Sequence, residues 1–78
     1  DWRYQVMIDE AQARKLAENF LQKQDSRGHT YRISGVRSNE KRPGVYGVIF
    51  DVYTPENSLL DGPLVMLVDK RTGETYPL

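Results

Sequence analysis

The chain has 78 residues, of which 38% are hydrophobic and 28% charged, and its 11 basic side chains balance its 11 acidic ones. This composition is typical of one globular domain with a small core, and it excludes a disordered chain. The balanced charge argues against a nucleic-acid binder, which usually has a basic excess that neutralises phosphates. The absence of Cys excludes disulfides and thiolate chemistry.

No segment of the sequence predicts insertion into a membrane. No apolar run approaches the roughly 20 residues that a transmembrane helix needs, and no signal peptide is recognisable. The chain opens on Asp1 rather than Met, which leaves open that an upstream signal or anchor has been removed. We therefore expect a cytoplasmic protein, or an extracytoplasmic one if such a segment preceded it.

The first seven residues predict either a short strand or an extended arm. Trp2, Tyr4 and Val6 alternate along this segment, so these side chains would share one side of an extended chain. The aromatic rings would then pack on the domain that follows, and this contact would hold a terminal segment that otherwise frays.

An amphipathic helix is the clearest local signal, and we expect it over about residues 10–24. Asp9 is a good N-cap, and Gln12 three residues later can complete a capping box. Ile8 stands before the cap, in the position of a hydrophobic staple. Apolar residues then recur at helical spacing and predict one buried stripe: Ala13, Leu16, Ala17, Phe20 and Leu21.

A turn and a first strand are expected after the helix. Asp25-Ser26-Arg27-Gly28 predicts the helix end, because its Gly can adopt the left-handed conformation that closes helices. Tyr31 and Ile33 then alternate with polar residues, which predicts a half-buried strand to about Val36. Gly35 inside this strand indicates a bulge.

Three further strand segments follow. Residues 45–53 are the strongest, because they are rich in β-branched and aromatic side chains. Residues 64–69 resemble a central strand, and residues 74–78 form a short final one. A polar connection over 37–44 and a longer loop over 54–63 join these segments.

The order of the elements predicts a single α+β domain over residues 1–78. After the arm of residues 1–7, a helical unit of residues 9–25 would pack on one face of an antiparallel sheet built from residues 30–78. Short connections between consecutive strands favour a meander of three or four strands. This arrangement resembles the cystatin-like and PepSY-like architectures.

Catalytic, cofactor-binding and metal-binding residues are not expected. His29 is the only histidine, and because no catalytic partner is adjacent to it, we interpret it as an exposed loop residue. One His and no Cys provide too few ligands for zinc. Asp51 falls inside an apolar strand. It either protects a sheet edge or bulge, pairs with an arginine or is a functional carboxylate. So short a chain has little room for a ligand pocket, so we expect no enzyme.

The remaining features favour the recognition of another protein. Leu59 and Leu60 are consecutive in the loop of residues 54–63, where they either form a contact surface or fold back over the end of the core. Tyr53 belongs to a set of five tyrosines that, with Trp2, suit an interface, although half-buried strands take such residues more often.

A basic cluster in the connection of residues 37–44 is a further candidate for binding. Arg37, Lys41 and Arg42 would attract an acidic partner surface, or they would simply be a solvated turn. The oligomeric state stays open, because an exposed edge strand can also pair with a second copy.

Three motifs carry a family resemblance over residues 9–78. The helix has the pattern Ala-x-x-x-Ala-x-x-Phe-Leu (Ala13–Leu21), the central strand is aromatic (Tyr46–Tyr53), and a Gly-Pro-Leu turn leads into Val-Asp-Lys-Arg-Thr-Gly-Glu (Gly62–Glu74). Together they resemble the YrhB-like immunity protein 35 family of bacteria. Family members typically have a Trp at the head of the central strand, where this chain has Gly44-Val45-Tyr46-Gly47. The Asp-Lys-x-Thr-Gly-Glu hairpin is also similar to that of PepSY domains.

The resemblance implies a non-catalytic bacterial protein that binds and neutralises a cognate toxin, with no cofactor and no membrane insertion by this segment. It transfers no site residue, because the shared positions are structural ones. The alternative is an extracytoplasmic regulatory or propeptide-like domain of a larger bacterial envelope protein. A small hydrolase or ligand carrier would need a deep pocket that joins at least two carboxylates.

Overall fold

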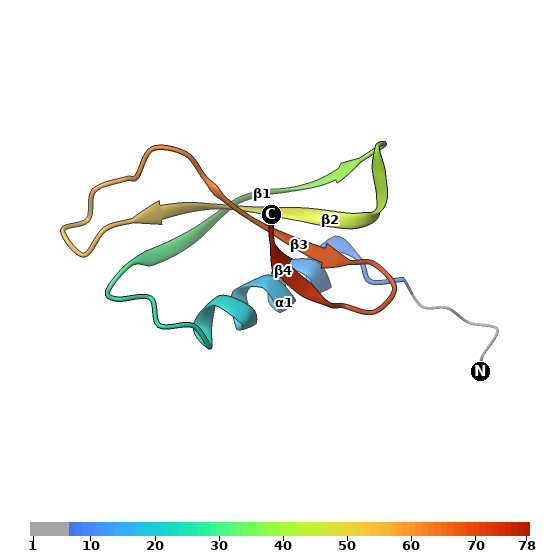
Figure 1. Ribbon diagram of the computed structural model, residues 1–78, viewed down its shortest axis with the longest axis horizontal. Helices are drawn as coiled ribbons and strands as arrows, with labels where there is room; N and C mark the ends of the chain where they lie inside the picture. Colours follow the sequence, from blue (N-terminus) through green and yellow to red (C-terminus); the bar gives the residue numbers. More distant parts are fainter. Residues whose placement is uncertain (1–6) are drawn as a thin grey trace.

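The computed structural model describes residues 7–78 and contains one helix and one four-stranded sheet. The elements are α1 (Glu10–Gln22), β1 (Thr30–Asn39), β2 (Arg42–Tyr53), β3 (Leu64–Asp69) and β4 (Thr75–Pro77). Each strand pairs with the next in antiparallel orientation, in the order β1-β2-β3-β4, and α1 packs on one face (Figure 1). The expected α+β meander is therefore confirmed. The N-terminal arm, with Trp2, Tyr4 and Val6, lies outside the described residues except for Met7.

The start of α1 follows the capping pattern of the sequence. The Asp9 carboxylate accepts from the Gln12 N–H at 2.8 Å, and the Gln12 side-chain oxygen accepts from the Asp9 N–H at 3.0 Å. Just before the cap, the Ile8 N–H donates to the Lys70 carbonyl at 2.8 Å. The helix start is thus joined to the turn between β3 and β4, more than 60 residues away in sequence.

The end of α1 differs from the expectation. The helix stops at Gln22, and its C-cap Lys23 keeps a right-handed conformation, with φ −83°. Gly28 instead forms a separate turn with Arg27, since both have positive φ (84° and 53°) and the His29 N–H donates to the Ser26 carbonyl at 3.0 Å. Between Leu21 and Tyr31 the chain has no apolar side chain, so a longer helix would have had no apolar side to bury.

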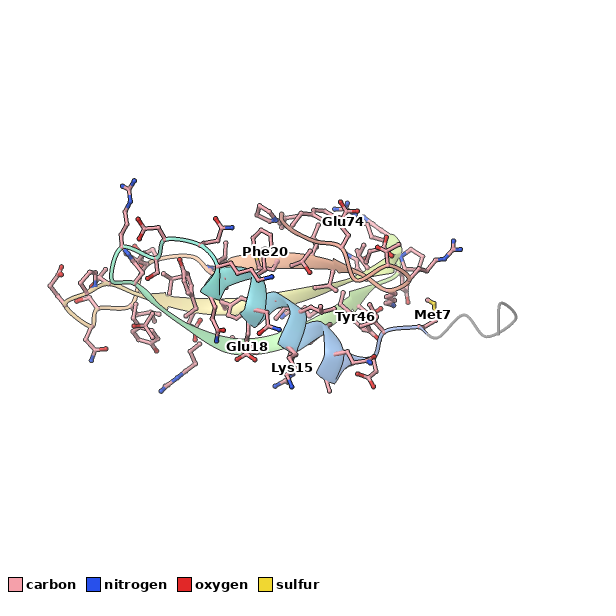
Figure 2. The ribbon with its side chains drawn as sticks, turned by 90° about the horizontal axis from the view of Figure 1, so that it is seen from below. Met7, Lys15, Glu18, Phe20, Tyr46 and Glu74 are labelled. Atoms are coloured by element: carbon pink, nitrogen blue, oxygen red, sulfur yellow. The ribbon has the colours of Figure 1, made fainter. Side chains whose placement is uncertain are left out.

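The core lies between α1 and the central strands. Ala13 and Ala17 are fully buried, and opposite them Val48 and Phe50 from β2 are 0% and 1% exposed. Leu21 of α1 and Met66 and Val68 of β3 complete the buried cluster. Figure 2 shows α1 across the sheet, with Phe20 directed toward β3 and β4 and Glu18 toward β1. The small alanine side chains allow the helix backbone to approach the sheet closely.

The connection between β1 and β2 is much shorter than expected. Residues 37–39 belong to β1 and residues 42–44 to β2, so only Glu40 and Lys41 form the turn. The register passes from Ser38↔Tyr46 directly to Asn39↔Arg42, which leaves three residues of β2 without partners in β1. The Pro-Gly pair lies in this bulge, where a missing N–H costs no ladder hydrogen bond. The Pro-Gly pair is the reason why residues 37–44 resemble a loop in the sequence.

β1 is an edge strand, and its bulge was expected. The pairing shifts between Ile33 and Gly35, so Ser34 is the extra residue. Beyond the bulge, the Lys70 ammonium lies 4.6 Å from the centre of the Tyr46 ring and donates to the Ser38 hydroxyl at 2.8 Å. This side chain connects the β3–β4 turn to the far end of β1.

Close packing of α1 gives a direct test of the fold. We expect Ala17→Leu to lower the free energy of unfolding by about 1–3 kcal/mol, because three extra carbon atoms would enter a filled interface. Ala11→Leu adds the same atoms at an exposed position of the same helix and should change it by less than about 0.5 kcal/mol. Urea denaturation measures both values, and equal effects would contradict this packing.

Candidate functional site

The sheet face opposite α1 has no helix or strand over it within residues 7–78 (Figure 1). We call it the open face. The residues of β2 and β3 that point to it alternate with the core residues: Val45, Gly47, Ile49, Asp51, Tyr53, Val65 and Leu67. Most of these side chains are apolar, and all but Leu67 are partly exposed.

A groove of about 230 Å³ crosses this face. Its floor and rim residues come from β1, β2 and β3 and from the residue just after β4: Arg37, Asn39, Arg42, Val45, Gly47, Ile49, Val65, Leu67 and Leu78. Gly47 makes the groove deeper, because a Cβ there would lie 3.6 Å from Val65 Cγ1 and 4.0 Å from Leu67 Cδ2. Leu67 is only 7% exposed and forms the bottom, whereas Leu78 at the rim is 76% exposed.

Two arginines stand at the groove, and none of its nine lining residues is acidic. Arg37 pairs across the strands with Gly47, and Arg42 begins β2. Both were expected in a polar connection, but the longer strands place them on the sheet. Lys41, the third member of the basic cluster, lies in the two-residue turn and does not line the groove.

The other end of the open face is more polar. The Arg32 guanidinium lies 6.0 Å from the centre of the Tyr53 ring, and Arg32 pairs across the strands with Asp51. This register brings the side chains of Arg32 and Asp51 to the same face of the sheet. Leu59 forms a bridge with Tyr53, so the two side chains lie on the same side of the sheet.

The two consecutive leucines are both exposed. Leu59 is 57% and Leu60 42% accessible, so neither closes the end of the core. The Leu60 N–H donates to the Val52 carbonyl at 2.9 Å, which attaches this part of the loop to β2. Tyr53 and Leu59 thus extend the open face into the loop of residues 54–63, and Leu60 lies beside them. Their role in binding stays a prediction.

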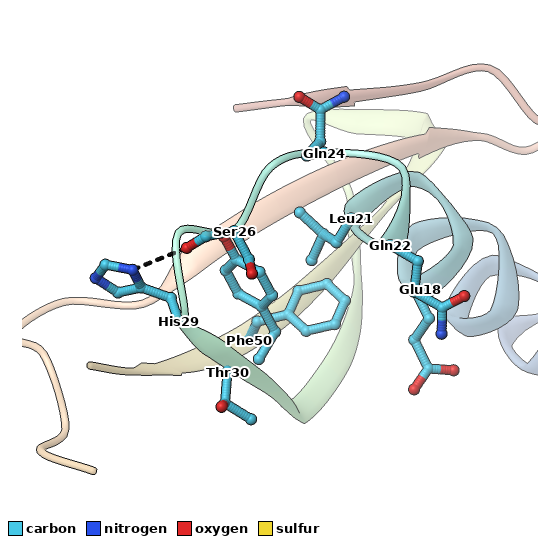
Figure 3. Close-up of a pocket in the computed structure, with 9 residues that line it drawn as sticks. Glu18, Leu21, Gln22, Gln24, Ser26, His29, Thr30 and Phe50 are labelled. Carbon is cyan, nitrogen blue, oxygen red and sulfur yellow. Dashed lines mark hydrogen bonds between the residues drawn. The ribbon is translucent and has the colours of Figure 1, made fainter. Parts of the chain in front are cut away.

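A second cleft, of about 290 Å³, lies where α1 ends (Figure 3). Its floor contains Tyr31 and Phe50, whose rings meet edge to face at 6.4 Å between centroids. The His29 Nδ1 lies 2.9 Å from the Ser26 carbonyl oxygen, an acceptor to which it can only donate. Figure 3 shows His29 and Glu18 at opposite ends of the cleft and directed away from each other. The two groups therefore form no acid–base pair in this arrangement.

Within residues 7–78, no three His, Asp or Glu side chains come together in a way that would hold a metal ion. The described helix has 13 residues and is too short and polar to cross a bilayer. Comparisons of the chain with protein-family models, curated proteins and solved structures found no match.

The sequence indicates the arginines and the leucines as binding residues but does not indicate the apolar floor between them. The available signal was the alternation along residues 45–53, which divides the strand into two faces. Alternation shows which side chains share a face, but not which of two apolar faces a single helix covers. That choice depends on the packing of α1.

The turn after β3 contains a carboxyl group, that of Asp69, whose pKa clearly departs from its ordinary value. The Asp69 carboxylate accepts from the N–H groups of Arg71 at 2.8 Å and Thr72 at 3.0 Å. These backbone donors, that of Thr72 most strongly, lower the pKa of Asp69 below its usual 3.8. The ionised carboxylate therefore stabilises the turn that also bonds to the start of α1.

We expect the stability that Asp69 contributes to depend on pH. Its pKa is lower in the folded than in the unfolded chain, so the contribution is complete above pH 3.8 and is lost as the pH falls through the folded value. Asp69→Asn should be less stable than the wild type at neutral pH, and the difference should shrink in acid. Urea midpoints across this range measure it, with Asp61→Asn controlling for the lost charge. A difference that does not change with pH would contradict the role of ionised Asp69.

Proposed function

We propose that this protein is a non-catalytic module that binds another protein, and that the partner is a bacterial toxin which it neutralises. The observation that carries the proposal is the open face, which has an apolar, partly exposed groove at one end and exposed Leu59 beside Tyr53 at the other. When one face of an antiparallel sheet faces water, it normally carries polar side chains. An apolar face on a small domain is typical of an interaction site.

The family resemblance supports the choice of a toxin as the partner. The three motifs that resemble immunity protein 35 occupy structural positions: Ala13 and Ala17 bury the helix, and Asp69 organises the β3–β4 turn. Such a scaffold leaves its opposite surface free to recognise a cognate protein. We place this function in the cytoplasm of a bacterium.

A regulatory or propeptide-like domain of an envelope protein is the second candidate. It is favoured by the β3–β4 turn, whose Asp-Lys-x-Thr-Gly-Glu sequence is similar to that of PepSY domains and whose Asp69 binds two backbone N–H groups. The gene distinguishes the candidates, because a signal peptide or membrane anchor encoded upstream of Asp1 would favour the envelope protein.

Co-expression tests the toxin hypothesis. We expect the gene beside the native one to encode a protein that stops bacterial growth when expressed alone and permits growth together with this protein. The two purified proteins should also elute together in size-exclusion chromatography. A harmless neighbour, or a toxic one that this protein neither binds nor neutralises, would contradict the proposal.

The leucines provide a test at residue level. We expect Leu59→Asp and Leu60→Asp each to weaken binding of the purified partner by about tenfold or more, because a buried contact would be replaced by a charge. The circular dichroism spectra should not change, since both side chains are exposed. Met7→Asp is a matched control, because Met7 is 49% exposed and precedes α1. Unfolding of both leucine variants would instead assign these residues to the core.

A further inference from the structure

We propose that the groove of the open face binds a segment of the partner in which an apolar side chain is next to a carboxylate. The apolar side chain would lie on the floor over Gly47 and Leu67, and the carboxylate would meet Arg37 and Arg42. This inference rests on the proposed protein-binding function and specifies the chemistry of the partner.

The size of the groove suits a side chain better than a metabolite. Its volume of about 230 Å³ is below the roughly 300–1,000 Å³ of most small-molecule sites. Five of the nine lining residues are the floor residues Val45, Gly47, Ile49, Val65 and Leu67, which carry no polar side-chain atom. A leucine, methionine or phenylalanine of the partner would bury this floor and exclude water from it.

The charge of the groove favours an acidic partner. Arg37 and Arg42 are both exposed, both line the groove, and no acidic residue lines it with them. A guanidinium binds a carboxylate through two parallel hydrogen bonds, and such charge-assisted bonds strengthen when an apolar contact beside them excludes water. The site thus combines non-specific apolar burial with directional recognition of one charged group.

A second copy of this chain fits the same groove poorly. A two-fold dimer brings a surface patch against itself. In such a dimer, Arg37 and Arg42 of one copy would face the same two arginines of the other copy, and these are the only charged residues that line the groove. Like charges across an interface oppose association, so we infer a different protein as the occupant.

Synthetic peptides test this inference without the natural partner. The first peptide has leucines flanked by glutamates and blocked ends, and it is titrated into ¹⁵N-labelled protein while amide signals are recorded. We expect saturable shifts at Gly47, Ile49 and Val65 and none at the exposed helix residues Ala11 and Lys15. A peptide with lysines for glutamates, and one with serines for leucines, should each produce no saturable shift. A blocked glutamate-free peptide and its version with a free C-terminal carboxylate distinguish a side-chain carboxylate from a chain end.

Arginine variants show whether the charge is recognised at this position. Arg37→Glu and Arg42→Glu should each weaken binding of the glutamate peptide by about tenfold or more. The double variant should bind the lysine peptide instead. Arg14→Glu is the matched control, because this exposed arginine lies on α1 at the opposite face. Its affinity for the glutamate peptide should stay within about threefold of the wild type, since a distant exposed charge is screened by salt.

Three outcomes of the peptide experiments would overturn the inference. The first is no saturable shift with any acidic leucine peptide, and the second is equal affinity of the wild type and the arginine variants. The third is a change of the groove amides with protein concentration in the absence of peptide, which would identify a second copy as the occupant. Failure of toxin neutralisation with intact peptide binding would refute the proposed function alone. Neutralisation that survives both arginine substitutions would refute this inference alone.

Discussion

The contact between the alanine stripe of α1 and the middle of the sheet determines the rest of this structure. Ala13 and Ala17 have no exposed surface, so the helix lies directly against Val48 and Phe50 of β2. A single helix of 13 residues covers only one face of the sheet. The other face is therefore left open to the surroundings. Because this face is apolar, its burial against another molecule is favourable. The packing of α1 on one face of the sheet thus determines both the fold and the position of the proposed binding surface.

Much of the fold was predictable because its signals are local. The capping box depends on two residues three positions apart, the buried stripe on helical spacing, and the bulge of β1 on one glycine. The helix end and the β1–β2 turn were not predictable in the same way. Gly28 resembles a helix terminator but forms a separate turn with Arg27, and Pro43-Gly44 resembles a loop but lies in a bulge that arises from the pairing of β1 with β2.

The candidate site was partly visible in the sequence. Exposed Leu59 and Leu60 were identified from their place in a polar segment, and Arg37 and Arg42 from their charge. Their relation to one another was not visible, because it arises from strand pairing. Pairing Arg37 with Gly47 brings a charge beside a position without a side chain, and this juxtaposition forms the groove.

The extra residue Ser34 has a consequence for how this molecule meets others. An edge strand normally exposes a regular row of backbone groups, and such a row templates the growth of fibrils. The irregular pairing at Ser34 interrupts that row in the middle of β1, and Arg32 and Arg37 on either side add repulsion between identical chains. The molecule can thus keep an apolar surface exposed while the neighbouring edge strand disfavours polymerisation.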